Sequence, residues 1–135
     1  RETLARHSGL ADFAFAMQGL GSGAISLAGS AAQRERYLPQ VVSGRAIAAF
    51  ALSEPEAGSD VAALACSATR DGHHYVLNGE KIFVTSGERS DAVVVWATLD
   101  KELGRAAIKS FVVPRGTPGI SSVTFDSPAK GIVTI

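Results

Sequence analysis

Two polar segments that contain glycine are the places where this chain could do chemistry. The first is Ser53–Asp60 (SEPEAGSD) and the second is Leu77–Gly87 (LNGEKIFVTSG). In the first segment Pro55 fixes φ and Gly58 permits a positive φ, so the loop can turn successive backbone N–H groups toward an anion such as a pyrophosphate. An ordinary surface turn explains the same residues, and taken alone it is the simpler interpretation.

Phe83 and Thr85 are the chemical centre of the second segment. They stand two apart in an expected strand, which places both side chains on the same face. An aromatic ring beside a hydroxyl could pack a planar heterocycle and hydrogen-bond its edge. By spacing alone, however, ordinary core packing of a strand is the better interpretation of the pair.

Other kinds of site are excluded by their missing patterns. The three carboxylates between residues 54 and 60 lack the alternating spacing and central glycine of a calcium loop. His73 and His74 are adjacent in an expected strand, point to opposite faces and cannot chelate one metal. No nucleophile elbow, phosphate-binding P-loop or paired-glycine dinucleotide fingerprint is present, which excludes the Rossmann class. We therefore predict no metal site.

The composition is that of an ordinary globular domain. The chain has 135 residues, 46% of them hydrophobic, with 13 basic and 13 acidic side chains and a formal net charge of zero. A nucleic-acid partner is disfavoured because it usually requires a basic excess, and no apolar run reaches the roughly 20 residues of a membrane-spanning helix. The single cysteine, Cys66, excludes an internal disulfide and suits a reducing compartment. Because the chain starts at Arg1 and stops in a strand-like segment, we expect it to be a piece of a longer polypeptide.

The first third of the chain has helical periodicity. Ser8 is the expected N-cap of a helix over residues 10–27, and Ser30 with Gln33 forms the capping box of a second helix over residues 34–38, perturbed at Pro39 and closed by Gly44. The buried face of the first helix is predicted to carry Leu10, Phe13, Met17, Leu20, Ala24 and Leu27. A neighbouring stripe of Ala16, Gly19 and Gly23 suggests close approach of another backbone.

From residue 45 the period becomes two. Strands are expected at residues 46–52, 92–98, 108–113 and 120–125, and a hairpin over residues 74–85 turns at Asn78-Gly79, the strongest short turn signal in the chain. Helices followed by strands indicate an α+β fold. We predict a helical segment over residues 1–44 and a small antiparallel β-barrel domain over residues 45–135.

Four segments taken together resemble one protein family. They are Ala31–Pro39 (AAQRERYLP), Ser53–Asp60, Leu77–Thr85 (LNGEKIFVT) and Gly116–Ile120 (GTPGI). In order and spacing they are similar to the acyl-CoA dehydrogenase family, and the likeness runs from about residue 7 to residue 120. The resemblance implies the end of an amino-terminal helical domain followed by a middle β-barrel domain. The carboxy-terminal four-helix domain of the family would be absent.

The resemblance also implies an activity and a cofactor. The family uses FAD to oxidise an acyl-CoA thioester to the trans-2-enoyl-CoA: a glutamate takes the α-proton and the β-hydride moves to flavin N5. Carried over by motif, Thr85 should donate a hydrogen bond to N5, Phe83 should pack on the ring and Val84 should lie beside it. Ser53 should contact the pyrimidine side, assisted by the backbone of Phe50 and Leu52. Gly58 and Ser59 should approach the pyrophosphate, with Ser59 also near the CoA part of the substrate.

The chain departs from the family pattern at three positions within these motifs. Ser53 replaces a threonine and keeps the hydroxyl, Phe83 replaces a tryptophan and loses the indole N–H, and Ser86 replaces an asparagine. The catalytic glutamate is expected in the missing domain, so no catalytic residue is assigned here, and Glu54 and Glu56 are not candidates for that role.

Several expectations about the whole protein rest on the resemblance alone. They are an electron-transfer flavoprotein as electron acceptor, a homotetramer, and a bacterial cytoplasmic or mitochondrial matrix location. A flavin-dependent monooxygenase or oxidase on the same scaffold is the alternative function, and a non-catalytic binding module is a third.

Overall fold

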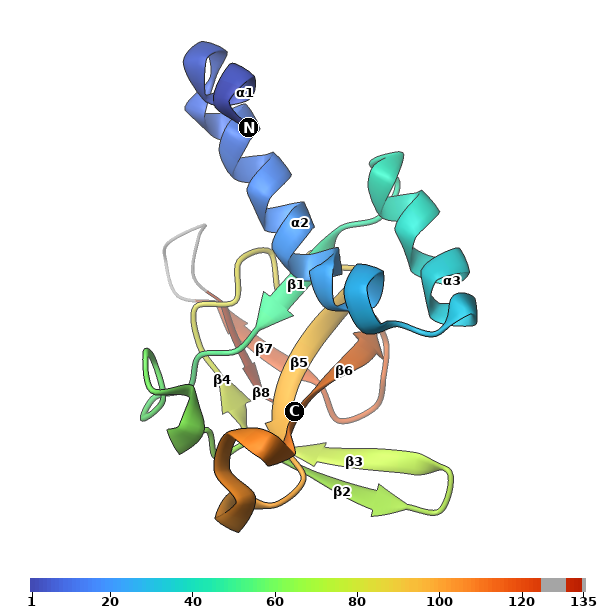
Figure 1. Ribbon diagram of the computed structural model, residues 1–135, viewed down its shortest axis with the longest axis vertical. Coiled ribbons are helices and arrows are strands. Elements are labelled where there is room, and N and C mark those ends of the chain that lie inside the picture. Colours follow the sequence, from blue (N-terminus) through green and yellow to red (C-terminus); the bar gives the residue numbers. More distant parts are fainter. Residues whose placement is uncertain (125–130, 135) are drawn as a thin grey trace.

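A computed structural model of the chain describes residues 1–124 and 131–134, and it places helices before strands (Figure 1). The helices are α1 (Glu2–His7), α2 (Gly9–Ala28) and α3 (Ala31–Val42), and two short 3-10 segments are η1 (Val61–Ala63) and η2 (Lys101–Ala107). The described strands are β1 (Ala48–Ala51), β2 (Ser67–Asp71), β3 (His74–Asn78), β4 (Glu80–Lys81), β5 (Ala92–Thr98), β6 (Ile108–Pro114), β7 (Ser121–Thr124) and β8 (Gly131–Thr134).

The helix ends confirm the predicted caps. The backbone N–H of Ala11 donates to Ser8 Oγ at 3.2 Å. Ser30 and Gln33 form the reciprocal capping box that opens α3. That helix continues past Pro39 to Val42, four residues beyond the predicted end. Although proline has no N–H to donate, its carbonyl oxygen still accepts from the N–H of Ser43 at 3.1 Å. A positive φ of 72° at Gly44 then follows the helix end, as expected.

The main sheet is mixed, so the prediction of an antiparallel barrel is wrong. Its central strand is β5, which pairs in parallel with β1, antiparallel with β6 and, through one bridge from Thr98, in parallel with β2. The strands β4, β8 and β7 form a second sheet, and among the described residues the sheets do not close into a barrel. The parallel pair arises because the chain makes a long excursion between β1 and β5, and therefore re-enters in the same direction.

The predicted hairpin is also wrong. The actual hairpin joins β2 to β3 and turns at Gly72, whose φ is 57°. Asn78-Gly79 ends β3, and the next strand, β4, pairs with β8 instead. A Cβ at Gly79 would lie 2.7 Å from Cys66 Cα. Glycine is therefore required at this position by close packing and not by a tight turn. Residues 82–89 form bends and turns and contain no strand.

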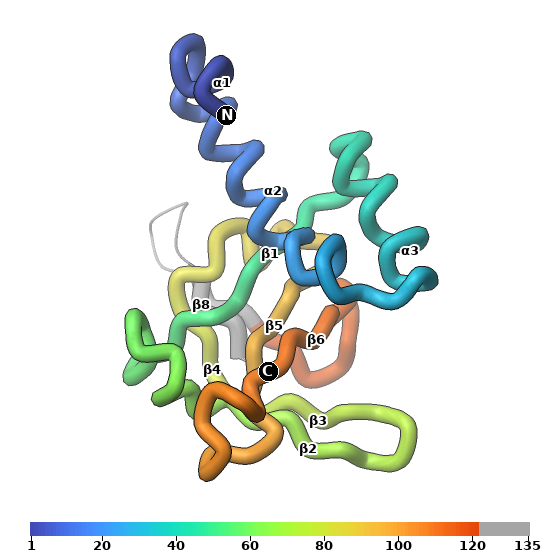
Figure 2. Tube along the Cα trace, viewed as in Figure 1, coloured from blue at the N-terminus to red at the C-terminus, as the bar shows by residue number. Residues whose placement is uncertain are grey.

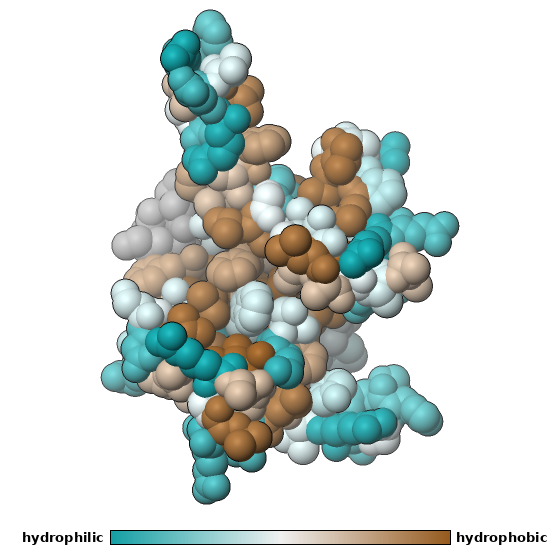
Figure 3. Space-filling model, viewed as in Figure 1, coloured by the Kyte–Doolittle hydropathy of each residue, from teal (hydrophilic) through white to brown (hydrophobic). Residues whose placement is uncertain are grey.

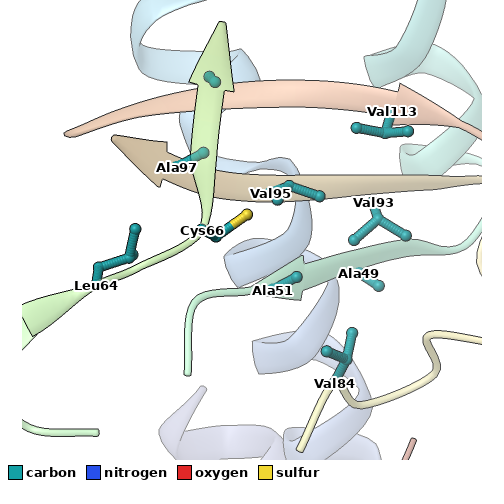
Figure 4. Packing of buried hydrophobic residues seen from close by; sticks show 10 residues of the cluster. Ala49, Ala51, Leu64, Cys66, Val84, Val93, Val95, Ala97 and Val113 are labelled. Carbon is teal, nitrogen blue, oxygen red and sulfur yellow. The ribbon is translucent and has the colours of Figure 1, made fainter. Parts of the chain in front are cut away.

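The core lies between β1, β5, β6 and the loops that pack beneath them (Figure 4). Its members are small, mostly alanine and valine, as expected for strands that pack closely on both faces. Val84, from the loop after β4, points toward β1 and is 1% exposed. The buried cluster is Ala49, Ala51, Leu64, Cys66, Ala68, Val84, Val93, Val95, Ala97 and Val113.

One face of α2 packs against β1, but it is not the predicted face. The buried residues of the helix are Gly21 and Ile25, and a Cβ at Gly21 would lie 2.5 Å from the carbonyl oxygen of Ala48. The predicted close approach is real but occurs at Gly21, since Gly19 and Gly23 have no atom within 4 Å of such a Cβ.

The predicted buried face of α2 is largely exposed. Leu10 is 77% exposed and Leu27 is 85% exposed. The tube in Figure 2 shows that α1 and the first half of α2 extend away from the sheet, and Figure 3 shows apolar side chains on the surface over the helices. The helical periodicity is therefore correct, and the stripe it marks is not covered by the described residues.

Candidate functional site

The first polar segment leaves the end of β1 and folds into a closed loop. We call residues 52–60 the first arm. Within it, the backbone groups of Glu54 and Ala57 bond to each other in both directions, at 2.9 and 3.2 Å. Asp60 accepts a hydrogen bond from the N–H of Ala62 and caps η1. Between these fixed points Gly58 and Ser59 are exposed, so their backbone is available to a ligand.

The second polar segment, residues 81–87, forms the second arm. Lys81 and Val84 anchor it, with 0% and 1% of their surface exposed. Between them Phe83 is 61% exposed and has a φ of 57°. Thr85 is half-buried, and Ser86 has a φ of 61°. Positive φ values are uncommon outside glycine and cluster at functional sites. The Phe83 side chain is exposed, whereas the nearby Lys81 and Val84 are buried.

The backbones of the two arms lie side by side. The N–H of Ile82 donates to the carbonyl oxygen of Ser53 at 2.9 Å. Lys81 Nζ donates to the carbonyl oxygen of Leu52 at 3.0 Å and to Glu54 Oε1 at 2.6 Å. The sequence placed the first arm after an expected strand and the second within an expected hairpin, and it indicated no contact between them. The contact depends on the long excursion after β1, which periodicity does not reveal.

Glu54 is the most densely bonded side chain of the site. Besides Lys81, its carboxylate accepts from the N–H groups of Ala65 and Cys66 at 2.6 and 2.9 Å. Burial by itself would raise the pKa of Glu54, but the hydrogen bonds from Lys81, Ala65 and Cys66 outweigh it and hold the pKa below its usual value. Glu54 is therefore a charged structural group and not a proton acceptor for a ligand. Burial raises the pKa of the Cys66 thiol, which keeps it protonated.

A cavity of about 400 Å³ opens beside the first arm. Its walls are mostly apolar, with one guanidinium at the edge: Arg105 approaches Asp60 at 3.8 Å and is largely exposed. Phe50 and Trp96 meet edge to face, with ring centroids 6.2 Å apart. Trp96 Nε1 is buried and has no hydrogen-bond partner among the described residues. The lining residues are Phe50, Leu52, Ser59, Val61, Trp96, Arg105 and Ile108.

The structure brings together most of the residues that the sequence singled out. Phe50, Leu52 and Ser59 line the cavity, and Gly58 lies beside Ser59 on the exposed tip of the first arm. Ser53 contacts the second arm through its carbonyl oxygen.

Two findings differ from the expectation for the second arm. Phe83 and Thr85 do not share the face of a strand, because residues 82–85 are not in one. The side chain of Val84 packs in the core, so only its backbone can face a ligand.

Four side chains that shape this region were not singled out from the sequence as site residues: Lys81 and Glu54, which join the arms, and Trp96 and Arg105, which line the cavity. Glu54 and Lys81 belong to the quoted motifs, but Lys81 directly follows Glu80 and no local pattern marks either side chain as buried. Nothing in the local sequence marks Trp96 or Arg105, which reach the cavity from β5 and η2. Among the described residues no group of three metal-binding side chains occurs, and no helix there is long and apolar enough to cross a membrane.

Known proteins match this arrangement. The model of the acyl-CoA dehydrogenase middle domain matches residues 49–132. Mitochondrial isovaleryl-CoA dehydrogenase of Pongo abelii is 44% identical over 96 residues, which is 70% of this chain and 23% of that protein. The chain thus spans about a quarter of the length of that relative.

Solved structures match over almost the whole chain. The complex of glutaryl-CoA dehydrogenase with glutaryl-CoA superposes with a TM-score of 0.90 and 30% identity, over 99% of this chain and 36% of that one. An FAD-dependent dehydrogenase gives a TM-score of 0.86 and 40% identity, over 92% of this chain and 35% of that one. The matched residues include both arms and the strands that hold them. The chain belongs to the acyl-CoA dehydrogenase family and covers the region of its middle domain.

Proposed function

We propose that this chain is the flavin-holding part of an FAD-dependent acyl-CoA dehydrogenase, which oxidises an acyl-CoA thioester to the trans-2-enoyl-CoA. The observation that supports the proposal is the contact between the arms. The bond from Ile82 to Ser53 joins the segment that carries the exposed Phe83 and Thr85 to the segment that carries Gly58 and Ser59. An aromatic surface, hydroxyls and free N–H groups suit a planar ring that carries a pyrophosphate.

The residues present fit FAD, which when bound would supply the two-electron acceptor for the substrate hydride. Phe83 would cover part of the ring, flanked by the Val84 backbone, and Thr85 would donate a hydrogen bond at N5, where negative charge develops on reduction. Ser53, with the backbone of Phe50 and Leu52, would hold the pyrimidine side. The exposed Gly58 and Ser59 backbone would approach the pyrophosphate.

The cavity beside the first arm would hold part of the acyl-CoA. Its apolar walls suit the pantetheine chain, Ser59 offers a hydroxyl, and Arg105 offers a positive charge to a phosphate. The α-proton would be taken by a glutamate outside these 135 residues, since Glu54 is fully engaged within the fold. A homotetramer, an electron-transfer flavoprotein as acceptor, and a bacterial cytoplasmic or mitochondrial matrix location complete the proposal.

The test uses the whole protein that carries this chain. We expect the purified protein to be yellow, and a saturated acyl-CoA added without oxygen to bleach the flavin absorbance. A colourless protein that does not take up FAD would refute the proposal. Reduced protein that reacts rapidly with oxygen would favour the oxidase or monooxygenase alternative instead.

A narrower test concerns Thr85. In Thr85→Ala the rate of flavin reduction should fall about tenfold or more, by comparison with the loss of other oriented donors, while the acyl-CoA dissociation constant changes little. Thr69→Ala, an exposed threonine on β2, is the matched control. Equal reduction rates in Thr85→Ala and wild type would remove Thr85 from the mechanism.

A further inference from the structure

Lys81 and Glu54 form an ion pair inside the protein. The two residues are 27 positions apart, their side chains are 0% and 5% exposed, and Nζ lies 2.6 Å from Oε1. Buried ion pairs contribute little net stability compared with apolar residues of the same volume, because both charges must leave water. Stability is therefore a weak explanation for this pair.

The contacts of the pair join the arms to each other. The second bond of Lys81 Nζ goes to the carbonyl oxygen of Leu52, one residue before Ser53. One residue after Lys81, the N–H of Ile82 reaches the carbonyl oxygen of Ser53. A charged side chain and a backbone group of the second arm thus hold two successive carbonyl groups of the first arm, which fixes the register between them.

Glu54 also holds the residues that follow the first arm. It accepts from Ala65 and Cys66, which follow η1, so one carboxylate fixes both ends of the segment that carries Gly58 and Ser59. Neither Lys81 nor Glu54 is exposed enough to touch a ligand directly. Any effect of the pair on a bound molecule must act through the residues that it positions.

We infer that the buried Lys81–Glu54 pair is a positioning element that sets the register of the two arms and so determines how tightly the protein holds its flavin. This inference rests on the proposed function for the identity of the ligand. The register itself is a property of the protein and can be measured without FAD.

The test compares variants in the whole protein that carries this chain. Lys81→Met keeps most of the side-chain length but removes the bond to Leu52 and leaves Glu54 without its cation. The double variant Lys81→Met with Glu54→Gln removes the unpaired charge as well, and it carries the test if the single variant does not fold. For each folded variant we expect the FAD dissociation constant to rise about tenfold, equivalent to about 1.4 kcal/mol. The bound flavin should also show altered visible circular dichroism.

Hydrogen exchange gives a readout that does not need FAD. In the apoprotein, the amide of Ile82 should exchange faster in either variant, whereas that of Val94 in the centre of β5 should change little. Lys109→Met is the matched control, because Lys109 is an exposed lysine whose Nζ also donates to a carbonyl oxygen, that of Ala106, at 2.7 Å. It should leave both the FAD affinity and the exchange of Ile82 unchanged.

The outcomes separate this inference from the proposed function. Wild-type protein that binds no FAD refutes the proposed function, while the exchange of Ile82 still decides whether the pair sets the register. A folded Lys81 variant with wild-type FAD affinity and wild-type exchange at Ile82 overturns the inference. A variant with lower unfolding free energy but unchanged FAD affinity in its folded fraction also overturns it, because the pair would then be merely structural.

Discussion

The contact between α2 and β1 predicts that chemically identical substitutions in one helix have opposite effects. Gly21, Gly19 and Gly23 are all interior residues of α2. Replacing an interior helical glycine by alanine favours the folded state by about 1 kcal/mol, because alanine loses less backbone entropy. This gain is expected for Gly19→Ala and Gly23→Ala, whose new methyl groups meet no atom within 4 Å.

Gly21→Ala should destabilise the protein instead. Its Cβ would lie 2.5 Å from the Ala48 carbonyl oxygen and 2.6 Å from the Ala48 carbonyl carbon, where ordinary contact begins at 3.4 Å. The helix and the strand would have to separate by about 0.9 Å, because neither backbone can yield locally.

That separation also strains the hydrogen bonds across the seam. The Gln18 side-chain amide accepts from the Ala48 N–H at 2.9 Å and donates to the Ala48 carbonyl at 3.3 Å. Losing these two bonds forfeits about 1 kcal/mol each, and overpacking strain adds about 1–3 kcal/mol. After the propensity gain of about 1 kcal/mol, we expect Gly21→Ala to lower the unfolding free energy by about 2–4 kcal/mol.

Urea denaturation followed by far-UV circular dichroism measures all three glycine variants under one condition. The expected order of stability is Gly19→Ala and Gly23→Ala above wild type, and Gly21→Ala below it. If Gly21→Ala were as stable as Gly23→Ala, α2 would not pack on β1 as described. The reasoning from close approach would then be refuted.

Three further predictions concern the site. The pKa of Glu54 is lower in the folded protein than in the unfolded chain, so the stability that this carboxylate contributes is full above the usual glutamate range and is lost as pH falls through the lowered pKa. In urea denaturation at a series of acidic pH values, Glu54→Gln should therefore lose less unfolding free energy per pH unit than wild type. An equal loss in both proteins would contradict the prediction. Gly79→Ala, whose Cβ would lie 2.7 Å from Cys66, should lose about 2 kcal/mol or more of unfolding free energy, whereas Gly58→Ala, with open space around it, should be near neutral. Arg105→Ala should raise the KM for acyl-CoA about two- to fivefold, as expected for an exposed charge, with the flavin spectrum unchanged; an unaltered KM would remove Arg105 from the substrate site.

The sequence correctly predicted those structural features that depend on interactions between residues close together in the chain. The caps at Ser8 and Ser30 involve residues three positions apart, and both are present as expected. The order of helices and strands is also correct, because periodicity reflects the environment of each element separately. The motifs around Ser53 and Phe83 identified the family.

Features that depend on distant partners were not predictable in this way. Asn78-Gly79 has the composition of a hairpin turn, but Gly79 is needed because Cys66, thirteen residues earlier, leaves no room for a side chain. Periodicity located the apolar stripe of α2, but it could not predict that β1 would pack against the face that contains Gly21 instead. The pairing of Lys81 with Glu54 follows from the contact between the arms and has no local signature.

The parallel pairing of β1 with β5 has a consequence for how this protein folds. Ile47 and Asp91 are bonded through both backbone and side chain across 44 residues of sequence, just before the strands begin to pair. Every residue proposed to hold the flavin lies inside the loop that this junction closes. The chain entropy lost when such a loop closes costs about 3 kcal/mol of free energy, which later contacts must offset. Pairings between residues far apart in the sequence also slow folding. We therefore expect cofactor binding to be a late event during folding, which begins only after β1 and β5 have met.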